Sequence, residues 1–241
     1  MVVNASNFAF PENTNIMLID QNQYQEIVKD LDQKNVKLVA VSKTKPVQAI
    51  QELYNLGHRD FGENYVQELV EKQVQLPADI RWHFIGHLQT NKVKYIAPFV
   101  HLVHGVDSWK LLTEINKQAA KQNRVIDLLL QIHIAQEETK FGLDENEIKD
   151  IIASLADVPQ HNIRVRGLMG MASFTENISQ IKEEFKYLKL LFDKYKELRT
   201  SNIQMDTLSM GMSSDYKIAV EEGSNMVRVG SLIFGERTYN K

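Results

Sequence analysis

Apolar and polar positions follow two alternating patterns along this chain. Short runs that are apolar almost throughout predict strands covered on both faces, as in a parallel sheet. We expect such strands at residues 37–41, 59–62, 81–85, 102–106, 126–134, 163–169, 207–210 and 226–229. The stretches between them carry apolar residues three and four positions apart, which is the spacing of an amphipathic helix.

Helices are predicted most clearly where the spacing is sustained or the ends are marked. Residues 178–195 repeat apolar side chains at intervals of three and four. Residues 46–56 start with a proline and are followed by a glycine, an arrangement common at helix ends. Further helices are expected at 64–73 and 108–121, and an additional amphipathic helix, around residues 24–31, precedes the first strand.

Eight strands, each followed by a helix or a short helical turn, predict an α/β fold: a single (β/α)8 barrel of the TIM type with an extra N-terminal helix. An open doubly wound sheet is the alternative. The length of 241 residues suits one barrel, and no linker or repeat divides the chain, so we expect one domain over residues 1–241. In a barrel, functional residues lie where the strands end and the following loops begin.

Composition narrows the function. The net charge of −3 argues against non-specific binding to nucleic acid or to an anionic membrane. The chain contains no cysteine, which excludes disulfides, thiol catalysis and cysteine-ligated metal. Residues 1–10 show no basic segment and no long apolar core, so no secretory signal is expected, and no window suggests a membrane helix. We therefore expect a cytoplasmic protein.

A lysine and two loops rich in glycine and serine stand at the predicted strand ends. Lys43 directly follows the first strand. Ser213 follows the seventh strand, and Gly230 and Ser231 follow the eighth, where barrels commonly bind phosphate through backbone amides and hydroxyls. The same residue types also simply form turns. A lysine beside a phosphate site indicates either a sugar-phosphate enzyme that forms a Schiff base or a pyridoxal phosphate protein.

Other polar residues are expected to have structural roles. Arg228 lies two residues before Gly230 and, as an isolated arginine, is expected to pair with a carboxylate or to belong to the barrel interior. His83 and His87 are four positions apart on a strand-to-loop segment, so no helical face aligns them as metal ligands. We predict no metal site. Lys45 is expected to point away from Lys43.

Six blocks of this sequence resemble the pyridoxal phosphate homeostasis protein family and occur in the order of that family. They are VAVSKTKP (39–46), FGENY (61–65), WHFIGHLQTNK (82–92), RGLM (166–169), LSMGMS (208–213) and VRVG (227–230). The resemblance implies a barrel of fold type III, the type that alanine racemase and eukaryotic ornithine decarboxylase share. The family often has proline where this chain has His87 and threonine where it has Ser231, a substitution that keeps the hydroxyl.

The resemblance also implies a cofactor and the residues that hold it. Pyridoxal 5′-phosphate would form an internal aldimine with Lys43, and Arg228 would face the pyridine nitrogen. Asn64 would lie near the ring. The residues implied for the phosphate are Ser209, Ser213, Gly230 and Ser231.

The implied function is to carry the cofactor. An arginine at the pyridine nitrogen leaves that nitrogen unprotonated, which weakens the cofactor as an electron sink and disfavours broad transaminase chemistry. We expect no second, β-rich domain like the one that completes the racemase active site. The resemblance thus implies a monomeric, non-catalytic protein of pyridoxal phosphate supply and amino-acid balance, with apoenzymes as possible recipients. The alternatives are an amino-acid racemase and a sugar-phosphate barrel without this cofactor.

Overall fold

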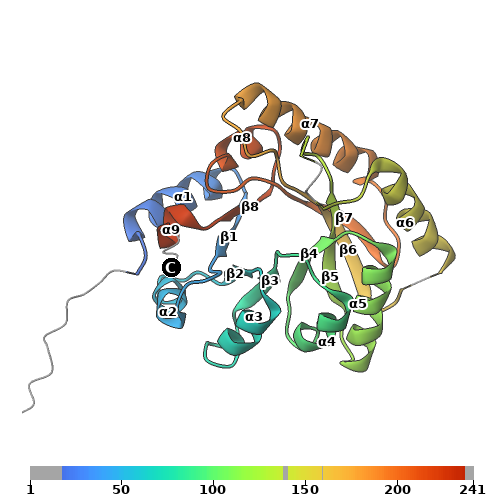
Figure 1. Ribbon diagram of the computed structural model, residues 1–241, viewed down its shortest axis with the longest axis horizontal. Coiled ribbons are helices and arrows are strands. Elements are labelled where there is room, and N and C mark those ends of the chain that lie inside the picture. The colour runs from blue at the N-terminus through green and yellow to red at the C-terminus, as the bar shows by residue number, and fades with distance from the viewer. Residues whose placement is uncertain (1–17, 138–140, 159, 237–241) are drawn as a thin grey trace, which may run out of the picture.

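Eight parallel strands close into a barrel in which the first strand pairs with both the second strand and the last. The computed structural model describes residues 18–137, 141–158 and 160–236. Residues 1–10, where no secretory signal is expected, lie outside these ranges. The larger helices surround the ring of strands (Figure 1). The predicted barrel is confirmed, and the open doubly wound sheet is wrong.

The strands agree closely with the apolar runs of the sequence. They are β1 (Lys37–Val41), β2 (Asp60–Glu63), β3 (Arg81–Phe84), β4 (Leu102–Val106), β5 (Ile126–Ile132), β6 (Ile163–Gly170), β7 (Ile203–Ser209) and β8 (Met226–Val229). The largest difference is β7, which begins four residues earlier than expected. In its first half the polar residues Gln204 and Asp206 alternate with the buried residues Ile203 and Met205, so no continuous apolar run marks the strand.

The helices follow the strands as expected, with additions. They are α1 (Gln21–Gln33), α2 (Val47–Asn55), α3 (Val66–Gln73), α4 (Val93–Ile96), α5 (Trp109–Lys121), α6 (Glu145–Asp157), α7 (Ile178–Tyr195), α8 (Tyr216–Glu221) and α9 (Ser231–Phe234), with a 3₁₀ turn, η1 (Thr90–Lys92). The extra N-terminal helix is confirmed as α1. The sequence reading missed α6, although Asp144 and Glu147 form a capping box at its start.

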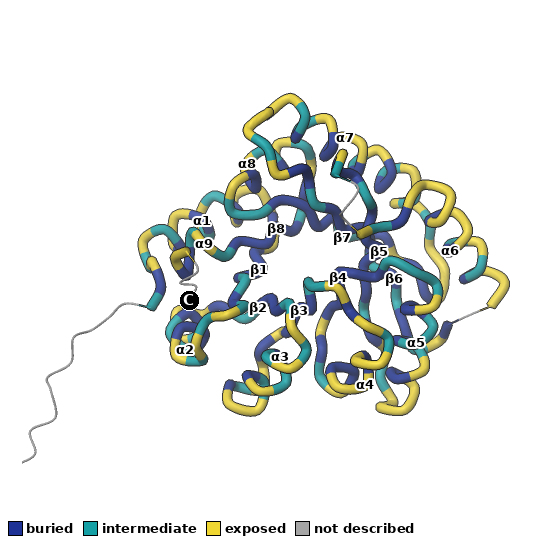
Figure 2. The backbone as a smooth tube through the Cα atoms, viewed as in Figure 1, coloured by how far each residue is buried: buried dark blue, intermediate teal, exposed yellow. Residues whose placement is uncertain are grey.

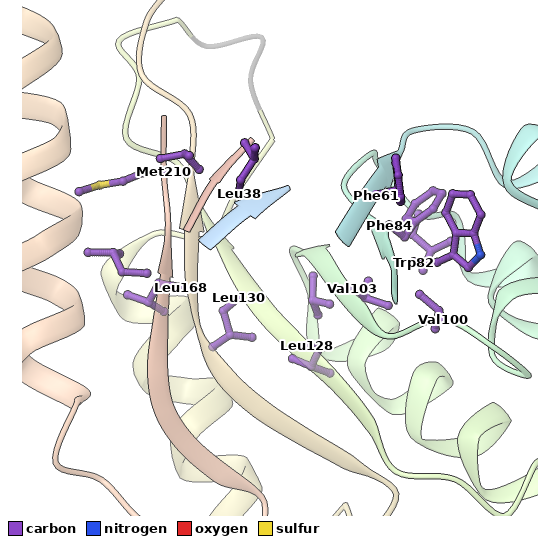
Figure 3. Close-up of a cluster of buried hydrophobic side chains, with 14 of the residues drawn as sticks. Leu38, Phe61, Trp82, Phe84, Val100, Val103, Leu128, Leu130, Leu168 and Met210 are labelled. Atoms are coloured by element: carbon purple, nitrogen blue, oxygen red, sulfur yellow. The ribbon is translucent and has the colours of Figure 1, made fainter. Parts of the chain in front are cut away.

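Side chains alternate between the two faces of the strands and build two apolar clusters. The larger cluster lies between strands and helices, and Figure 3 shows part of it, including Phe61, Trp82 and Phe84. A small second cluster consists of Val39, Leu102, Leu129, Met169 and Met226. Since these residues alternate with the helix-facing ones, they face the barrel interior. The strands are accordingly buried throughout most of their length (Figure 2).

The helices of the described ranges pack around the barrel. Among them, none combines the length and the apolar character that crossing a membrane requires.

Candidate functional site

A pocket of about 400 Å³ opens where the carboxyl ends of the strands meet the following loops. Its volume is within the range of small-molecule sites, roughly 300–1,000 Å³. Six of the seven candidate residues line it: Lys43, Asn64, Ser213, Arg228, Gly230 and Ser231. Residues from the ends of β1, β2, β7 and β8 are thereby brought to one cavity.

Lys43 lies in a tight turn directly after β1. The N–H of Lys45 donates to the carbonyl of Ser42 at 3.0 Å and closes this turn. Thr44 has a φ of 65°, a left-handed conformation that is rare for a β-branched residue. The N–H of Thr44 donates to Oε1 of Glu68 at 2.6 Å. These contacts fix the backbone on both sides of Lys43.

A buried charged cluster supports this turn from the neighbouring strand. The ammonium of Lys72 donates to the carbonyl of Ser42 at 2.8 Å, to Oε1 of Glu63 at 2.7 Å and to Oε1 of Glu68 at 2.6 Å. The Ser42 hydroxyl also donates to Oε1 of Glu63 at 2.6 Å. Burial raises the pKa of the Glu63 carboxyl to about 7, although Lys72 and Ser42 favour its charged form. The cluster ties the start of the Lys43 turn to β2 and α3.

The loops after β7 and β8 are joined to each other beside the pocket. Gly211 has a φ of 97°, and a Cβ there would lie 2.6 Å from that of Ala219, so glycine allows the loop to fold against α8. The hydroxyl of Ser213 accepts a hydrogen bond from the N–H of Gly230 at 3.1 Å. Ser231 is the first residue of α9, so its N–H has no partner within that helix. Amides and hydroxyls from two loops therefore face one end of the pocket.

Arg228 reaches the pocket from the barrel interior, where it is almost fully buried. Its Nη1 donates to the hydroxyl oxygen of Ser209 at 2.6 Å, and its Nη2 donates to the carbonyl of Gly170 at 3.0 Å. Burial lowers the pKa of this guanidinium to about 10, and the charge of Asp215 acts in the opposite direction. Of the two roles expected for an isolated arginine, the structure shows the place in the barrel interior.

Ser209 is the candidate that the structure does not bring to the pocket. Its side chain is fully buried between Arg228 and His104, and it is absent from the described lining of the cavity. The direct phosphate contact expected of Ser209 is therefore corrected to a contact with Arg228. Sequence alone could not separate Ser209 from Ser213, because both follow or end the same strand.

The structure adds residues that sequence reasoning left out. Lys45 lines the same pocket as Lys43, contrary to the expectation that it points away, and its Nζ donates to the carbonyl of Glu236 at 3.0 Å. The turn at Thr44 decides where Lys45 points, and the spacing of the two lysines in the sequence does not reveal that turn. Met171 and Phe174, from the loop after β6, also line the pocket, and Phe174 is 91% exposed at its rim.

The lining suits a small anion that carries a flat apolar ring. Two lysines and an arginine supply positive charge, and serine hydroxyls and loop amides supply donors. Val41, Ile85 and Met171 supply apolar walls. The side-chain oxygen of Asn64 is buried and has no hydrogen-bond partner among the described residues, so a ligand with a donor group could satisfy it.

His87 does not share these surroundings. Its ring stacks on Phe141, with centroids 4.8 Å apart, and its Nδ1 lies 3.3 Å from a carboxylate oxygen of Asp107. It lines a neighbouring cavity that also contains Asn64 and Tyr65. The structural role expected of His87 is consistent with this position, whereas His83 lies inside the barrel.

Comparison with known sequences identifies close relatives over nearly the whole chain. The profile of the family described as "Alanine racemase, N-terminal domain" matches residues 19–238. A "Pyridoxal phosphate homeostasis protein" of Aquifex aeolicus is 43% identical over 204 residues, which are 84% of this chain and 88% of that protein. The protein of the same name from Escherichia coli K12 is 38% identical over 212 residues, covering 86% of this chain and 88% of the relative.

Solved structures give the same picture. PipY of Synechococcus elongatus PCC7942, solved with PLP bound, superposes with a TM-score of 0.80 at 33% identity, covering 89% of this chain and 99% of PipY. The structure of PipY without PLP gives a TM-score of 0.82 at 32% identity with the same coverage. Alanine racemase of Streptomyces coelicolor has the same fold, with a TM-score of 0.68 at 15% identity. The superposition covers 89% of this chain and 58% of the racemase.

Proposed function

Because this chain belongs to the alanine racemase N-terminal domain family and, within it, to the pyridoxal phosphate homeostasis proteins, we propose that it binds pyridoxal 5′-phosphate in the pocket of Lys43. The cofactor is held as a Schiff base on Nζ of Lys43. The observation that carries this proposal is the convergence of Lys43, Arg228 and the loops after β7 and β8 on one cavity. The PLP-bound structure of PipY supports it.

Each part of the lining has a role in this proposal. The hydroxyls of Ser213 and Ser231 and the N–H of Ser231 hold the phosphate, and Gly230 keeps the Ser213 hydroxyl in place. Arg228 donates to the unprotonated nitrogen of the ring, since a guanidinium can only donate. The orphaned oxygen of Asn64 accepts a donor of the ligand. When bound, the cofactor supplies an aldehyde that condenses with an amine, with loss of one water molecule.

We also propose that the protein carries the cofactor and does not turn over a substrate. Among the described residues that line the pocket, the titratable side chains are Lys43, Lys45 and Arg228. A two-base racemase needs a second acid or base opposite the reactive lysine, and an arginine is too basic for that task. Lys45 follows Lys43 in the same turn, and its Nζ donates to the carbonyl of Glu236. The relatives are named for homeostasis. The proposed role is supply of the cofactor and amino-acid balance, with apoenzymes as recipients and a monomer as the acting species.

Covalent binding is tested with the purified protein and two matched lysine variants. The wild type takes up added pyridoxal phosphate, becomes yellow, and after borohydride reduction carries the cofactor on the peptide that contains Lys43. Lys43→Ala loses the absorption band completely. Lys45→Ala keeps the band and the same labelled residue, with weaker affinity. A colourless wild type that takes up no cofactor would sink the proposal, and labelling of Lys45 in place of Lys43 would move the site.

The carrier role needs a separate test. Cofactor-loaded protein is incubated with an apoenzyme that depends on pyridoxal phosphate, and restored activity of that enzyme measures delivery. In parallel, single enantiomers of amino acids are incubated with the loaded protein and analysed by chiral chromatography. Racemisation that disappears in Lys43→Ala would contradict the carrier proposal. Light scattering measures the mass and tests the monomer.

A further inference from the structure

A continuous line of buried polar side chains crosses the interior of the barrel and ends at Arg228. We call it the polar chain. Its members, from the start of β2 to the end of β8, are Asp60, His83, His104, Ser209 and Arg228. Each is at most 6% exposed, and the two histidines and the serine are fully buried. Buried polar groups of this kind are costly unless each one is satisfied, so the order of donors and acceptors is informative.

The order of the hydrogen bonds is fixed by the two ends of the polar chain, because Arg228 can only donate and the Asp60 carboxylate can only accept. A guanidinium has donors only, so the hydroxyl oxygen of Ser209 accepts from Nη1 of Arg228 at 2.6 Å. The hydroxyl proton of Ser209 is then available for its other neighbour, Nδ1 of His104 at 3.2 Å. A serine oxygen can also accept twice, so the opposite end decides the direction. The Asp60 carboxylate only accepts, so a neutral His83 donates to it at Nε2 and accepts at Nδ1 from His104. A neutral His104 that donates at Nε2 must accept at Nδ1.

The same reasoning continues through the second histidine. Nε2 of His104 donates to Nδ1 of His83 at 2.9 Å. His83 in turn carries its proton at Nε2 and donates to Oδ1 of Asp60 at 2.9 Å. The Asp60 carboxylate can only accept, and Arg81 donates to both of its oxygens. Every bond therefore points in one direction, from the arginine near the pocket to the carboxylate at the opposite end.

Burial supports the neutral state that this order requires. It lowers the pKa of His83, and it lowers that of His104 well below the ordinary value, with the charge of Arg228 acting in the same direction. A protonated histidine would offer two donors and reverse one of the bonds.

We propose that the polar chain positions Arg228 for the ligand pocket while leaving its positive charge unneutralised by direct contact with a carboxylate. The lone pair of Ser209 that faces Nη1 is fixed because the serine proton is committed to His104. The aligned dipoles stabilise the guanidinium. The Asp60 carboxylate stays at the far end with Arg81, and Asp215 acts on Arg228 through its charge, without a direct contact between these two side chains in the described residues. Ser209, His104 and His83 are thus positioning residues. This inference rests on the proposed function in one respect: the ligand of the pocket is taken to be pyridoxal phosphate.

The geometry also offers a metal site as a competing interpretation. Ligand atoms of Asp60, His83 and His101 lie within 4.8 Å of one another. A metal requires a histidine nitrogen without its proton, but Nε2 of His83 carries the proton that binds Asp60. Asp60 is also already bound by Arg81 through both oxygens. The hydrogen-bond order therefore disfavours a cation here, and binding of Zn²⁺ becomes an outcome of the test.

The first arm of the test needs no cofactor. Side-chain ¹⁵N NMR of the histidines, assigned with His83→Gln and His104→Gln, reports which ring nitrogen carries the proton. Both residues are expected as neutral Nε2–H tautomers throughout the neutral range. An Nδ1–H tautomer or an imidazolium at His104 would overturn the order. Tight stoichiometric Zn²⁺ binding by calorimetry, lost in His101→Ala, would overturn it as well.

The second arm measures the effect on the ligand. Ser209→Ala removes the acceptor of Arg228 and is expected to weaken cofactor affinity about tenfold, as for a hydrogen bond to a charged group, and to shift the absorption band. Ser209→Thr keeps the hydroxyl and is expected to restore both. Ser224→Ala is the matched control, because it removes a buried hydroxyl that binds only backbone carbonyls. An unchanged affinity and spectrum in Ser209→Ala would refute the positioning role.

The two arms separate this inference from the function on which it rests. A wild type that takes up no cofactor would refute the proposed function and the positioning of Arg228 for it, and the nitrogen shifts would still decide the hydrogen-bond order. A wild type that binds the cofactor while Ser209→Ala binds it equally well would leave the proposed function intact and remove the inference alone.

Discussion

Arginines at the two ends of the barrel have different partners. Near the amino ends of the strands, Arg81 binds Asp60 through two hydrogen bonds, and Arg164 binds Asp127 in the same manner. These arginines are about half exposed, whereas their carboxylates are nearly buried. A guanidinium that pairs with a carboxylate in this way compensates a charge that the fold has buried.

The arginine near the carboxyl ends is held in the opposite way. Arg228 is buried, and its nitrogens donate to two neutral oxygens, those of Ser209 and Gly170. Its positive charge is therefore retained at the pocket. Charge therefore compensates buried carboxylates at the amino end, and under the proposed function the charge at the carboxyl end is available to the ligand, in agreement with the division of roles between the two ends of such barrels.

Replacing each arginine with methionine gives the largest effect expected from this comparison. Arg81→Met leaves Asp60 buried without its main partner and is expected to lower the free energy of unfolding by about 3 kcal/mol. Arg228→Met leaves no carboxylate unpaired. It removes the donor of the buried oxygens of Ser209 and Gly170, and this loss is offset because a poorly solvated cation is replaced with an apolar chain, so the free energy of unfolding should change by only about 1 kcal/mol. Urea denaturation monitored by circular dichroism measures both.

The effect of the two substitutions on cofactor binding is expected in the reverse order, with the larger effect at Arg228. Arg228→Met is expected to weaken cofactor binding and alter its spectrum, because the donor to the ring is lost. Equal destabilisation by the two substitutions would contradict this difference between the two ends, since it would show that Arg228 also stabilises the fold.

The fold was predictable because the spacing of apolar residues along the sequence indicates the alternation of strands and helices. The bounds of β1, β4, β8 and α7 were obtained without error. What was missed depends on polar residues whose partners are distant in sequence. Asp206 interrupts the apolar pattern of β7 and binds Arg166 on the neighbouring strand, and no local pattern reveals that pair.

The sequence predicted which loops carry the candidate site, but it did not predict all the contacts between the side chains. Strand ends located Lys43, Gly230 and Ser231, since the carboxyl ends of barrel strands meet at one mouth. The burial of Ser209 could not be inferred, because it depends on His104 from β4, more than a hundred positions earlier. The family resemblance supplied the cofactor, which composition and spacing left open between two classes of phosphorylated aldehyde.

Glu63, at the end of β2, tests whether buried charges are less fully compensated at the carboxyl ends of the strands than at the amino ends. Its pKa of about 7 lies above the ordinary value of 4.5 because burial disfavours the charged form. Between pH 4.5 and pH 7 the Glu63 carboxyl is protonated in the folded protein and ionised in the unfolded chain. The contribution of Glu63 to the free energy of unfolding therefore falls as the pH rises through this range, and it stays low above pH 7.

The variant Glu63→Gln removes that pH dependence. Relative to the wild type, it is expected to gain about 2 kcal/mol in the free energy of unfolding when the pH is raised from 5 to 8. Glu71→Gln, at an exposed position of α3, serves as the control and should show no such gain. Parallel curves for Glu63→Gln and the wild type would show that Lys72 compensates this carboxylate as fully as Arg81 compensates Asp60.

The smallest effect concerns the backbone beside Lys43. Among the described residues other than glycine, positive φ values occur at Asn35, Thr44 and Asn123. Asparagine tolerates this conformation, whereas a β-branched residue is strained in it. The two asparagines follow α1 and α5, and the strained threonine lies at the pocket, so strain is concentrated at the end of the barrel that is proposed to bind the ligand.

Thr44→Asn should relieve this strain without changing the turn. The expected gain in the free energy of unfolding is about 1 kcal/mol, the lower range for a residue held in a disfavoured conformation. Asn123→Thr is the reciprocal control and should lose a similar amount, because it places a β-branched side chain at a φ of 51°. Thermal unfolding measures both changes, and cofactor titration of Thr44→Asn shows whether the strained residue also contributes to binding. If the threonine serves only to shape the turn, the cofactor affinity remains that of the wild type. If the affinity falls while the stability rises, the strained backbone contributes to binding. The two ends of the barrel then differ in backbone conformation as well as in charge.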